Sequence, residues 1–178
     1  MGLTLIGGGA RSGKSRFALE LAGARFERPT FIATAEAHDE EMKERIRIHQ
    51  SERGPGWATL EEPLDLPGAL ETTAAKTCDG CVVDCLTLWL SNVLLSPGHD
   101  EEGEIDRLLS QLKSWAGPPV ILVTNEVGCG IVPENALARR YRDLAGALNQ
   151  RVAALADEAY WMAFGVSIDL KKQGLRSG

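Results

Sequence analysis

The sequence has no excess of positive charge and no long uninterrupted apolar run. Its 19 Lys and Arg residues are outnumbered by 25 Asp and Glu, which gives a formal net charge of −6. No net field therefore attracts a polyanion, which excludes nucleic acids and anionic membranes as partners and requires any phosphate site to be a local basic pocket. The apolar stretch 81–95 is interrupted by Asp84 and Asn92 and is too short to span a bilayer. We therefore expect a small-molecule substrate.

Targeting signals are also lacking. No basic segment precedes the short apolar run near the N-terminus, and Ile6 stands where a myristoylation signal needs Ser or Thr. Repeats, low-complexity tracts and linkers are absent as well. With 178 residues, 44% of them hydrophobic, the chain can bury a full α/β core. We expect one cytoplasmic domain spanning residues 1–178.

Cysteine is scarce, with Cys78, Cys81, Cys85 and Cys129 as the full set. The Cys-x-x-Cys at 78 and 81 has no second pair and no nearby pair of histidines to complete a tetrahedral metal site. Cys81 and Cys85 fall in or beside a predicted strand, where a thiol serves as a small apolar side chain. We therefore expect neither a zinc site nor redox chemistry from these thiols.

The most informative segment is a glycine-rich loop. Residues 8–15 read Gly, four residues, then Gly-Lys-Ser, and they directly follow the apolar run 3–6. A strand that ends in such a loop and opens into a helix aims backbone N–H groups, the helix dipole and a lysine at one anion. The pattern predicts a P-loop for a nucleoside triphosphate. Lys14 would bind the β/γ-phosphates, and the Ser15 hydroxyl would bind Mg²⁺.

Apolar runs and helix-period segments alternate along the chain. We predict strands at 3–6, 30–33, 81–86, 120–124 and 159–164. We predict helices at 14–24, 39–52, 66–75, 86–95, 105–115 and 134–156. This alternation is typical of an α/β fold with a mostly parallel sheet and helices on both faces, here of the P-loop NTPase type.

The last predicted helix carries an apolar stripe that runs from Leu137 to Leu155, and Pro133 is suited to opening it. Its arginines are expected to form a solvated face; they are Arg139, Arg140, Arg142 and Arg151. Segments 53–56 and 96–103 read as exposed loops. The polar tail 171–178 is expected to fray.

Asp84 follows the buried strand residues Val82 and Val83, where a P-loop enzyme needs a carboxylate for Mg²⁺ or its waters. The alternative is a helix N-cap, because a helix is predicted from Leu86.

Two further groups lie at strand ends. Glu61 or Glu62 could contact a sugar hydroxyl or a metal. Asn125 and Glu126 follow a strand, and ligands bind at the carboxyl ends of strands in open α/β sheets.

His49 lies in the predicted helix 39–52, on the same face as Met42 and Ile46. This spacing favours a core histidine. A neutral imidazole near Arg45 and Arg53 could instead attack a phosphorus, since it is nucleophilic at pH 7 and the guanidiniums would offset phosphoryl charge. Both interpretations stay open on spacing alone. His38 and His99 are expected at the surface.

Several blocks together resemble one enzyme family. They are Gly-Gly-Ala-Arg-Ser-Gly-Lys-Ser at 8–15, Ile-Ala-Thr at 32–34, Glu-Met-x-x-Arg-Ile-x-x-His at 41–49, Trp-x-Thr-x-Glu at 57–61, Asp-Cys-Leu-Thr at 84–87, Thr-Asn-Glu-Val-Gly-x-Gly-Ile-Val-Pro-Glu-Asn at 124–135 and Arg-Asp-Leu-Ala-Gly-x-Leu-Asn-Gln at 142–150. This series closely resembles the bifunctional adenosylcobinamide kinase / adenosylcobinamide-phosphate guanylyltransferase family, nearly end to end.

The resemblance implies two reactions. ATP or GTP first phosphorylates the aminopropanol hydroxyl of adenosylcobinamide. GTP then guanylylates a histidine, which by the family pattern is His49, and the GMP passes to the substrate phosphate to give adenosyl-GDP-cobinamide. The resemblance also implies a RecA-like fold, a homotrimer and a corrinoid partner.

The nucleotide contacts that the resemblance carries over are Gly8, Gly9, Ala10, Arg11, Ser12, Gly13, Lys14, Ser15, Thr34, Ala35, Glu36, Gln50, Ser51, Glu52, Arg53, Glu61 and Asp84. Residues 50–53 match the family pattern loosely. Two alternatives remain: a P-loop kinase of another small alcohol without nucleotidyl transfer, and a nucleotide-dependent switch protein. The sequence shows no recognisable switch signature.

Overall fold

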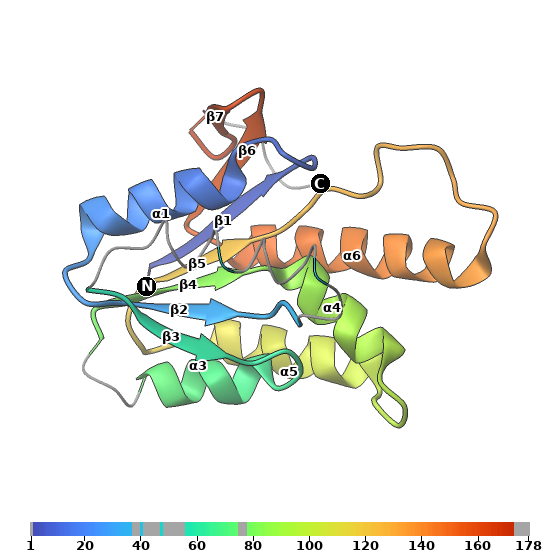
Figure 1. The fold of residues 1–178 in the computed structure, drawn as a ribbon, viewed down its shortest axis with the longest axis horizontal. Coiled ribbons are helices and arrows are strands. Elements are labelled where there is room, and N and C mark those ends of the chain that lie inside the picture. Colours follow the sequence, from blue (N-terminus) through green and yellow to red (C-terminus); the bar gives the residue numbers. More distant parts are fainter. Residues whose placement is uncertain (1, 37–39, 41–46, 48–55, 75–77, 173–178) are drawn as a thin grey trace.

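The computed structural model describes residues 2–36, 40, 47, 56–74 and 78–172. In this part of the chain seven strands form one sheet, in the order β3-β2-β4-β5-β1-β6-β7 (Figure 1). The strands are β1 (Leu3–Gly8), β2 (Pro29–Ala33), β3 (Ala58–Glu61), β4 (Gly80–Asp84), β5 (Val120–Val123), β6 (Glu158–Ala163) and β7 (Val166–Asp169). All neighbouring pairs are parallel except β6 and β7. The predicted, mostly parallel sheet is confirmed.

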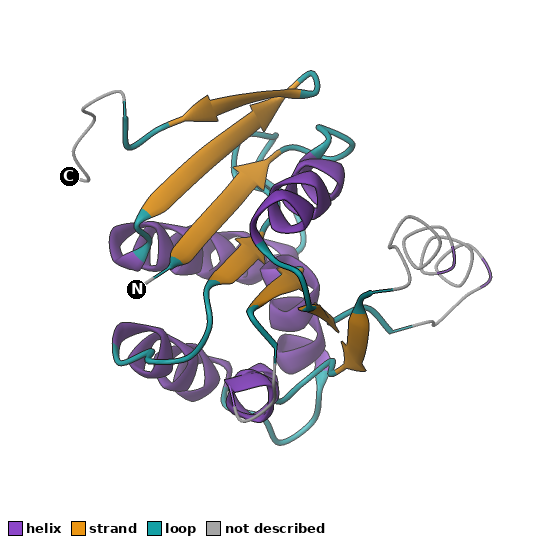
Figure 2. Ribbon diagram, turned by 90° about the vertical axis from the view of Figure 1, so that its left-hand side faces the viewer, coloured by secondary structure: helices purple, strands orange, loops and turns teal. Residues whose placement is uncertain are grey.

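Helices cover both faces of the sheet, as predicted, but unequally among the described residues. They are α1 (Lys14–Arg25), α3 (Leu66–Ala74), α4 (Leu86–Leu95), α5 (Glu101–Lys113) and α6 (Ala136–Leu155). Helix α1 packs on β4, β5 and β1. On the other face, α6 contacts β1, α4 and α5, and α3 packs against α5. Figure 2 shows the strands between α1 and this second layer.

Successive side chains of each strand point to opposite faces of the sheet, so a hydrophobic core forms on each face. Leu3 and Leu5 of β1 join the large core that α3 to α6 close, whereas Ile6 faces α1. Helix α1 meets the sheet through Ala18 and Ala22, both fully buried. These small side chains let the helix backbone approach the strands closely. The sheet therefore carries α1, and the loop before it, directly on its central strands.

Two helix starts differ from the sequence prediction. Helix α5 begins at Glu101 rather than at 105, because Glu101, Glu102 and Glu104 in its first turn suit the positive end of the helix dipole. The loop predicted at 96–103 is therefore shorter. Helix α6 begins at Ala136, with the Asn135 side chain accepting a hydrogen bond from the Ala138 N–H at 3.0 Å. Asparagine at the N-cap, and not the proline, opens this helix.

The strand predicted at 81–86 ends at Asp84, and helix α4 follows after one residue. Strands β3 and β7 were not among the predicted strands. Strand β7 forms an antiparallel hairpin with β6 through the turn at Phe164 and Gly165. No helix in the described segments is long and apolar enough to cross a membrane.

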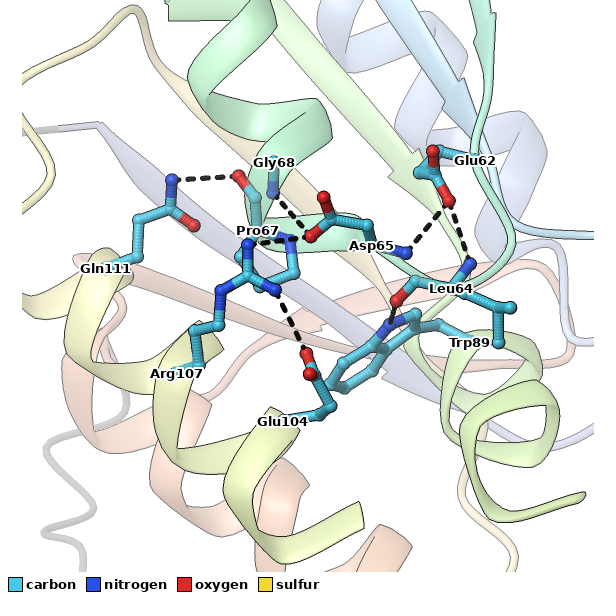
Figure 3. A network of polar contacts seen from close by, with 9 residues as sticks. All are labelled: Glu62, Leu64, Asp65, Pro67, Gly68, Trp89, Glu104, Arg107 and Gln111. Atoms are coloured by element: carbon cyan, nitrogen blue, oxygen red, sulfur yellow. Dashed lines mark hydrogen bonds and ion pairs between the residues drawn. The ribbon is translucent and has the colours of Figure 1, made fainter. Parts of the chain in front are cut away.

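The connection from β3 to α3 is held by polar contacts from two helices (Figure 3). The Glu62 carboxylate accepts hydrogen bonds from the N–H groups of Leu64 and Asp65. From α4, the buried Trp89 indole N–H donates to the Leu64 carbonyl at 2.7 Å. From α5, Arg107 pairs with Asp65 at 2.8 Å. These contacts fix the chain just after Glu61.

We predict that Trp89→Phe lowers the free energy of unfolding by about 2 kcal/mol, because it leaves the Leu64 carbonyl without its donor and opens a small cavity. Urea unfolding measures the loss. Trp115→Phe is the matched control, since its indole N–H donates to the nearby Pro118 carbonyl at 2.8 Å and lies at the edge of the core. A Trp89→Phe protein no less stable than the Trp115→Phe protein would contradict this account.

Candidate active site

The glycine-rich loop connects the end of β1 at Gly8 to the start of α1 at Lys14. A Cβ atom on Gly8 would lie 2.4 Å from the Met162 carbonyl oxygen of β6, so no larger residue fits there. Gly13, at φ +96°, occupies the left-handed region that favours glycine. A clash with neighbouring backbone therefore requires glycine at position 8, and the left-handed φ favours glycine at position 13. The local structure is the strand, loop and helix that the sequence predicted.

The first turn of α1 is available to an anion. Its N-cap residue Gly13 makes no side-chain capping hydrogen bond, and the turn contains no acidic residue. The first N–H groups of a helix have no partner within the helix, and the helix dipole adds partial positive charge at the same end. A phosphate bound there would satisfy both.

Lys14 is buried, with 7% of its surface exposed. Its ammonium group lies against the loop, donating to the Gly9 carbonyl at 2.6 Å. Burial lowers the pKa of Lys14, and nearby Cys85 and Asp84 act in the opposite direction. The ammonium therefore lies close enough to the end of β4 to interact electrostatically with Cys85 and Asp84.

The sheet brings the other predicted residues to the same edge. Ala33 of β2 pairs with Glu61 on one side and with Asp84 on the other. Asp84 pairs with Val123, and Val123 pairs with Ile6 of β1. Since neighbouring strands lie about 4.8 Å apart, Asp84 is roughly 10 Å across the sheet from β1. Glu61, Asp84 and the glycine-rich loop therefore lie along one edge.

Asp84 is the last residue of β4 and is half-buried. The N-cap of α4 is Cys85, which makes no side-chain capping bond. The alternative in which Asp84 caps this helix is therefore wrong. The metal-binding interpretation of Asp84 remains a hypothesis, and its position at a carboxyl end of the sheet is compatible with that role.

Thr34 holds the backbone that follows Asp84. Its fully buried hydroxyl donates to the Cys85 carbonyl and accepts from the Cys85 N–H, each at 2.8 Å. Its own N–H donates to the Asp84 carbonyl at 3.2 Å. The Thr34 side chain is thus committed to joining the ends of β2 and β4. Any nucleotide contact near residues 34–36 would have to come from other atoms.

A second set of contacts supports the end of β5. The Asn125 amide donates to the Thr87 hydroxyl at 2.9 Å, and Thr124 donates to Asn149 of α6 at 2.7 Å. Tyr141, also on α6, donates to the Thr87 carbonyl at 3.0 Å, and burial raises the pKa of Tyr141 to about 12. The roles of Thr87, Tyr141 and Asn149 were missed by sequence reasoning, because only the packing of α6 against α4 and β1 brings them together.

Two of the predicted carboxylates serve local turns. Glu62 accepts the N–H bonds after β3 described above, and Glu126 accepts from the Gly128 N–H. Glu61 lies exposed at the end of β3, so it is the better candidate for contact with a substrate hydroxyl. His49 and the predicted contacts 50–53 lie outside the described residues.

The arginines of α6 are more than a solvated face. Arg140 pairs with Glu101, and Arg151 pairs with Asp106 at 2.6 Å, which ties α6 to α5. Arg142 donates to the Gly128 carbonyl, and Arg139 donates to the carbonyls of Pro133 and Glu134. Arg142 and Arg139 therefore anchor the loop between β5 and α6.

None of the cysteines is in a disulfide; Cys81 and Cys85 are buried and Cys129 is exposed. Burial raises the pKa of Cys85 to about 11, and it raises the pKa of Cys81 as well. Within the described ranges no group of three or more His, Cys, Asp or Glu side chains could hold a metal ion.

The fold and the loop define a P-loop nucleotide-binding protein. Solved structures of similar fold include the EscN ATPase of the type III secretion system of enteropathogenic E. coli, with a TM-score of 0.61 and 10% identity over 99% of this chain and 50% of that one. A second solved ATPase domain has a TM-score of 0.50 and 14% identity, over 90% of this chain and 68% of that one. At such identities these structures bear on the fold alone.

Residues 4–170 match the model of the family described as cobinamide kinase / cobinamide phosphate guanyltransferase. The bifunctional adenosylcobalamin biosynthesis protein CobP of Pseudomonas aeruginosa is 45% identical, over 96% of this chain and 98% of its own. The corresponding protein CobU of Salmonella typhimurium is 39% identical, over 95% and 99%. The chain belongs to the cobinamide kinase / cobinamide phosphate guanyltransferase family, which confirms the resemblance drawn from the sequence.

The thiols give a test of the site's burial. At pH 8 we predict that iodoacetamide modifies Cys129 first and Cys85 on the order of 100-fold more slowly, because only the thiolate reacts and a pKa of about 11 leaves little of it. Peptide mapping by mass spectrometry measures both rates. In urea the two rates should converge. Rapid labelling of Cys85 in the folded protein would contradict a closed packing behind Asp84.

Proposed function

We propose that this single domain phosphorylates adenosylcobinamide with ATP or GTP and then transfers GMP from GTP to the product, giving adenosyl-GDP-cobinamide. The observation that carries the proposal is the buried Lys14 of the P-loop, within electrostatic reach of Asp84, in a chain that belongs to this enzyme family. A kinase of another small alcohol and a switch protein are disfavoured, because the family match extends over nearly the whole chain.

In the kinase step the aminopropanol hydroxyl oxygen attacks the γ-phosphorus and the nucleoside diphosphate leaves. Little covalent chemistry is required of the protein, so catalysis depends on positioning and on offsetting charge. The N–H groups of loop 8–15 and the Lys14 ammonium would hold the phosphates. The Thr34 hydroxyl, a predicted nucleotide contact, is bound to the Cys85 backbone instead.

The donors expected for Mg²⁺ are the Ser15 hydroxyl and the Asp84 carboxylate. Hard oxygen ligands of this kind fit Mg²⁺, which keeps several waters and takes few protein ligands. When bound, the ion would neutralise charge on the phosphates. Ser15 lies in the first turn of α1 and Asp84 ends β4, on the same edge of the sheet, which supports this assignment.

In the guanylyltransferase step, a ring nitrogen of His49 attacks the α-phosphorus of GTP and pyrophosphate leaves. The resulting phosphoramidate stores GMP until a phosphate oxygen of the corrinoid attacks it and frees the histidine.

We also propose a homotrimer acting in the cytoplasm. Exposed apolar side chains just before and at the start of α6, such as Ile131 and Leu137, support self-association.

Asp84→Asn is predicted to raise the Mg²⁺ concentration needed for half-maximal kinase activity by about ten-fold or more, because an amide lacks the charge that attracts the metal or its waters. A Mg²⁺ titration of the initial rate measures the change. The fold should persist, since Asp84 is half-buried at the end of its strand. An unchanged Mg²⁺ dependence would remove Asp84 from the metal site.

His49 supplies the sharpest test of the two-step function. With GTP and Mg²⁺, the intact protein should gain the mass of one GMP through an acid-labile, base-stable linkage, as a phosphoramidate does. His49→Ala should lose this adduct and the guanylyltransferase activity, while the kinase step persists at least in part because Lys14 and Asp84 remain. His99→Ala is the control and should keep the adduct. An adduct retained in folded His49→Ala would contradict the assignment.

A further inference from the structure

The β6–β7 hairpin is attached to the P-loop through main-chain contacts. The Gly165 N–H at its turn donates to the Ser12 carbonyl at 3.0 Å. A Cβ on Gly13 would lie 3.4 Å from the Gly165 Cα, at ordinary van der Waals distance, so the turn lies beside the end of the loop. At the other end of the loop, Gly8 is limited to glycine by Met162 of the same hairpin. The turn therefore has a fixed position relative to the P-loop.

Phe164 is the other central residue of this turn. A bulky aromatic side chain is unusual both in the backbone conformation of the turn and at an exposed position. Phe164 and Gly165 both have positive φ, +54° and +78°, as in a type I′ hairpin turn. Asn or Asp is favoured at the first of these positions, whereas a bulky residue in the left-handed region is strained. The Phe164 side chain is also fully exposed. Neither local geometry nor core packing explains an aromatic residue here.

The strand register shows on which face of the sheet the other exposed apolar residues of the hairpin lie. Val166 and Ile168 lie opposite Ala163 and Trp161, and directly opposed residues of an antiparallel pair share a sheet face. Met162 packs in the core under α1, so its neighbours Trp161 and Ala163 point to the other face. The strip of Val166 and Ile168 is thus on the α6 side of the sheet, away from α1.

We propose that Phe164 is a stacking platform for the base of the nucleoside triphosphate whose phosphates occupy the P-loop. The proposal rests on the proposed function, in which the P-loop binds that triphosphate. A nucleotide anchored at the start of α1 would extend away from the loop, and Phe164 is an exposed aromatic residue next in the chain to Gly165, whose N–H donates to the Ser12 carbonyl of the loop. Aromatic stacking tolerates any base, because every base has a π-face. Phe164 therefore binds without selecting the base, so ATP and GTP both serve the kinase step.

The test compares ligands with and without a base. Isothermal titration of the full chain would use Mg-ATP and inorganic tripolyphosphate. Phe164→Ala should weaken ATP binding by about ten-fold and leave tripolyphosphate binding unchanged, because stacking acts on the base alone. Phe164→Tyr should restore ATP binding. In the kinase assay the KM for ATP should rise with kcat retained, since the phosphates stay in place.

Val166→Ala is the matched control, because it removes an exposed apolar side chain from the same hairpin on the α6 side of the sheet. Its affinity for both ligands should equal that of the unaltered protein. If Phe164→Ala binds ATP normally, or if it weakens ATP and tripolyphosphate equally, the stacking proposal is overturned. A change in oligomer size in both variants, with ATP affinity intact, would assign the hairpin to an interface between copies and also overturn it.

Lys14→Ala separates this proposal from the proposed function. It should weaken ATP and tripolyphosphate alike, because the lysine binds phosphates and not the base. If Lys14→Ala binds tripolyphosphate normally, the P-loop assignment itself fails. If Lys14→Ala behaves as expected and Phe164→Ala does not, the triphosphate site stands and only the platform is lost.

Discussion

The whole site depends on the parallel pairing of β2, β4, β5 and β1. Parallel strands end at the same edge of a sheet, so a residue placed just after one strand meets residues placed after its neighbours. Thr34, Asp84, Asn125 and the glycine-rich loop all stand in such positions. The Thr34 hydroxyl then locks the ends of β2 and β4 together. A one-residue shift in register would turn these side chains to other faces of the sheet.

Much of this arrangement was predictable, because the signals are local. The loop 8–15 has a local pattern of glycines followed by Lys14 and Ser15, and Gly13 is favoured by its own left-handed φ. Buried strands such as Val82-Val83 stand out as β-branched runs, and Asp84 follows them directly. The family resemblance rests on blocks spread along the chain, which the match over residues 4–170 confirms.

The rest could not be predicted, because it depends on tertiary contacts. Val166-Ser167-Ile168-Asp169 is short and exposed, and it becomes a strand only because β6 is there to pair with it. Asn125 was correctly placed at the sheet edge, yet its amide supports Thr87. The roles of Thr87 and Asn149 follow from how α6 packs, which no spacing along the chain reveals.

The position of β1 in the sheet also has a consequence for how the protein is made. Both neighbours of this early strand come from far along the chain: Leu3 pairs with Val120, and Thr4 pairs with Glu158. Pairing over such separations carries a high loop-closure entropy and slows folding. On the ribosome, β2 and β4 can pair while β1 still lacks both partners. The glycine-rich loop 8–15, which follows β1 near the N-terminus, is therefore among the last parts of the molecule to acquire its structure.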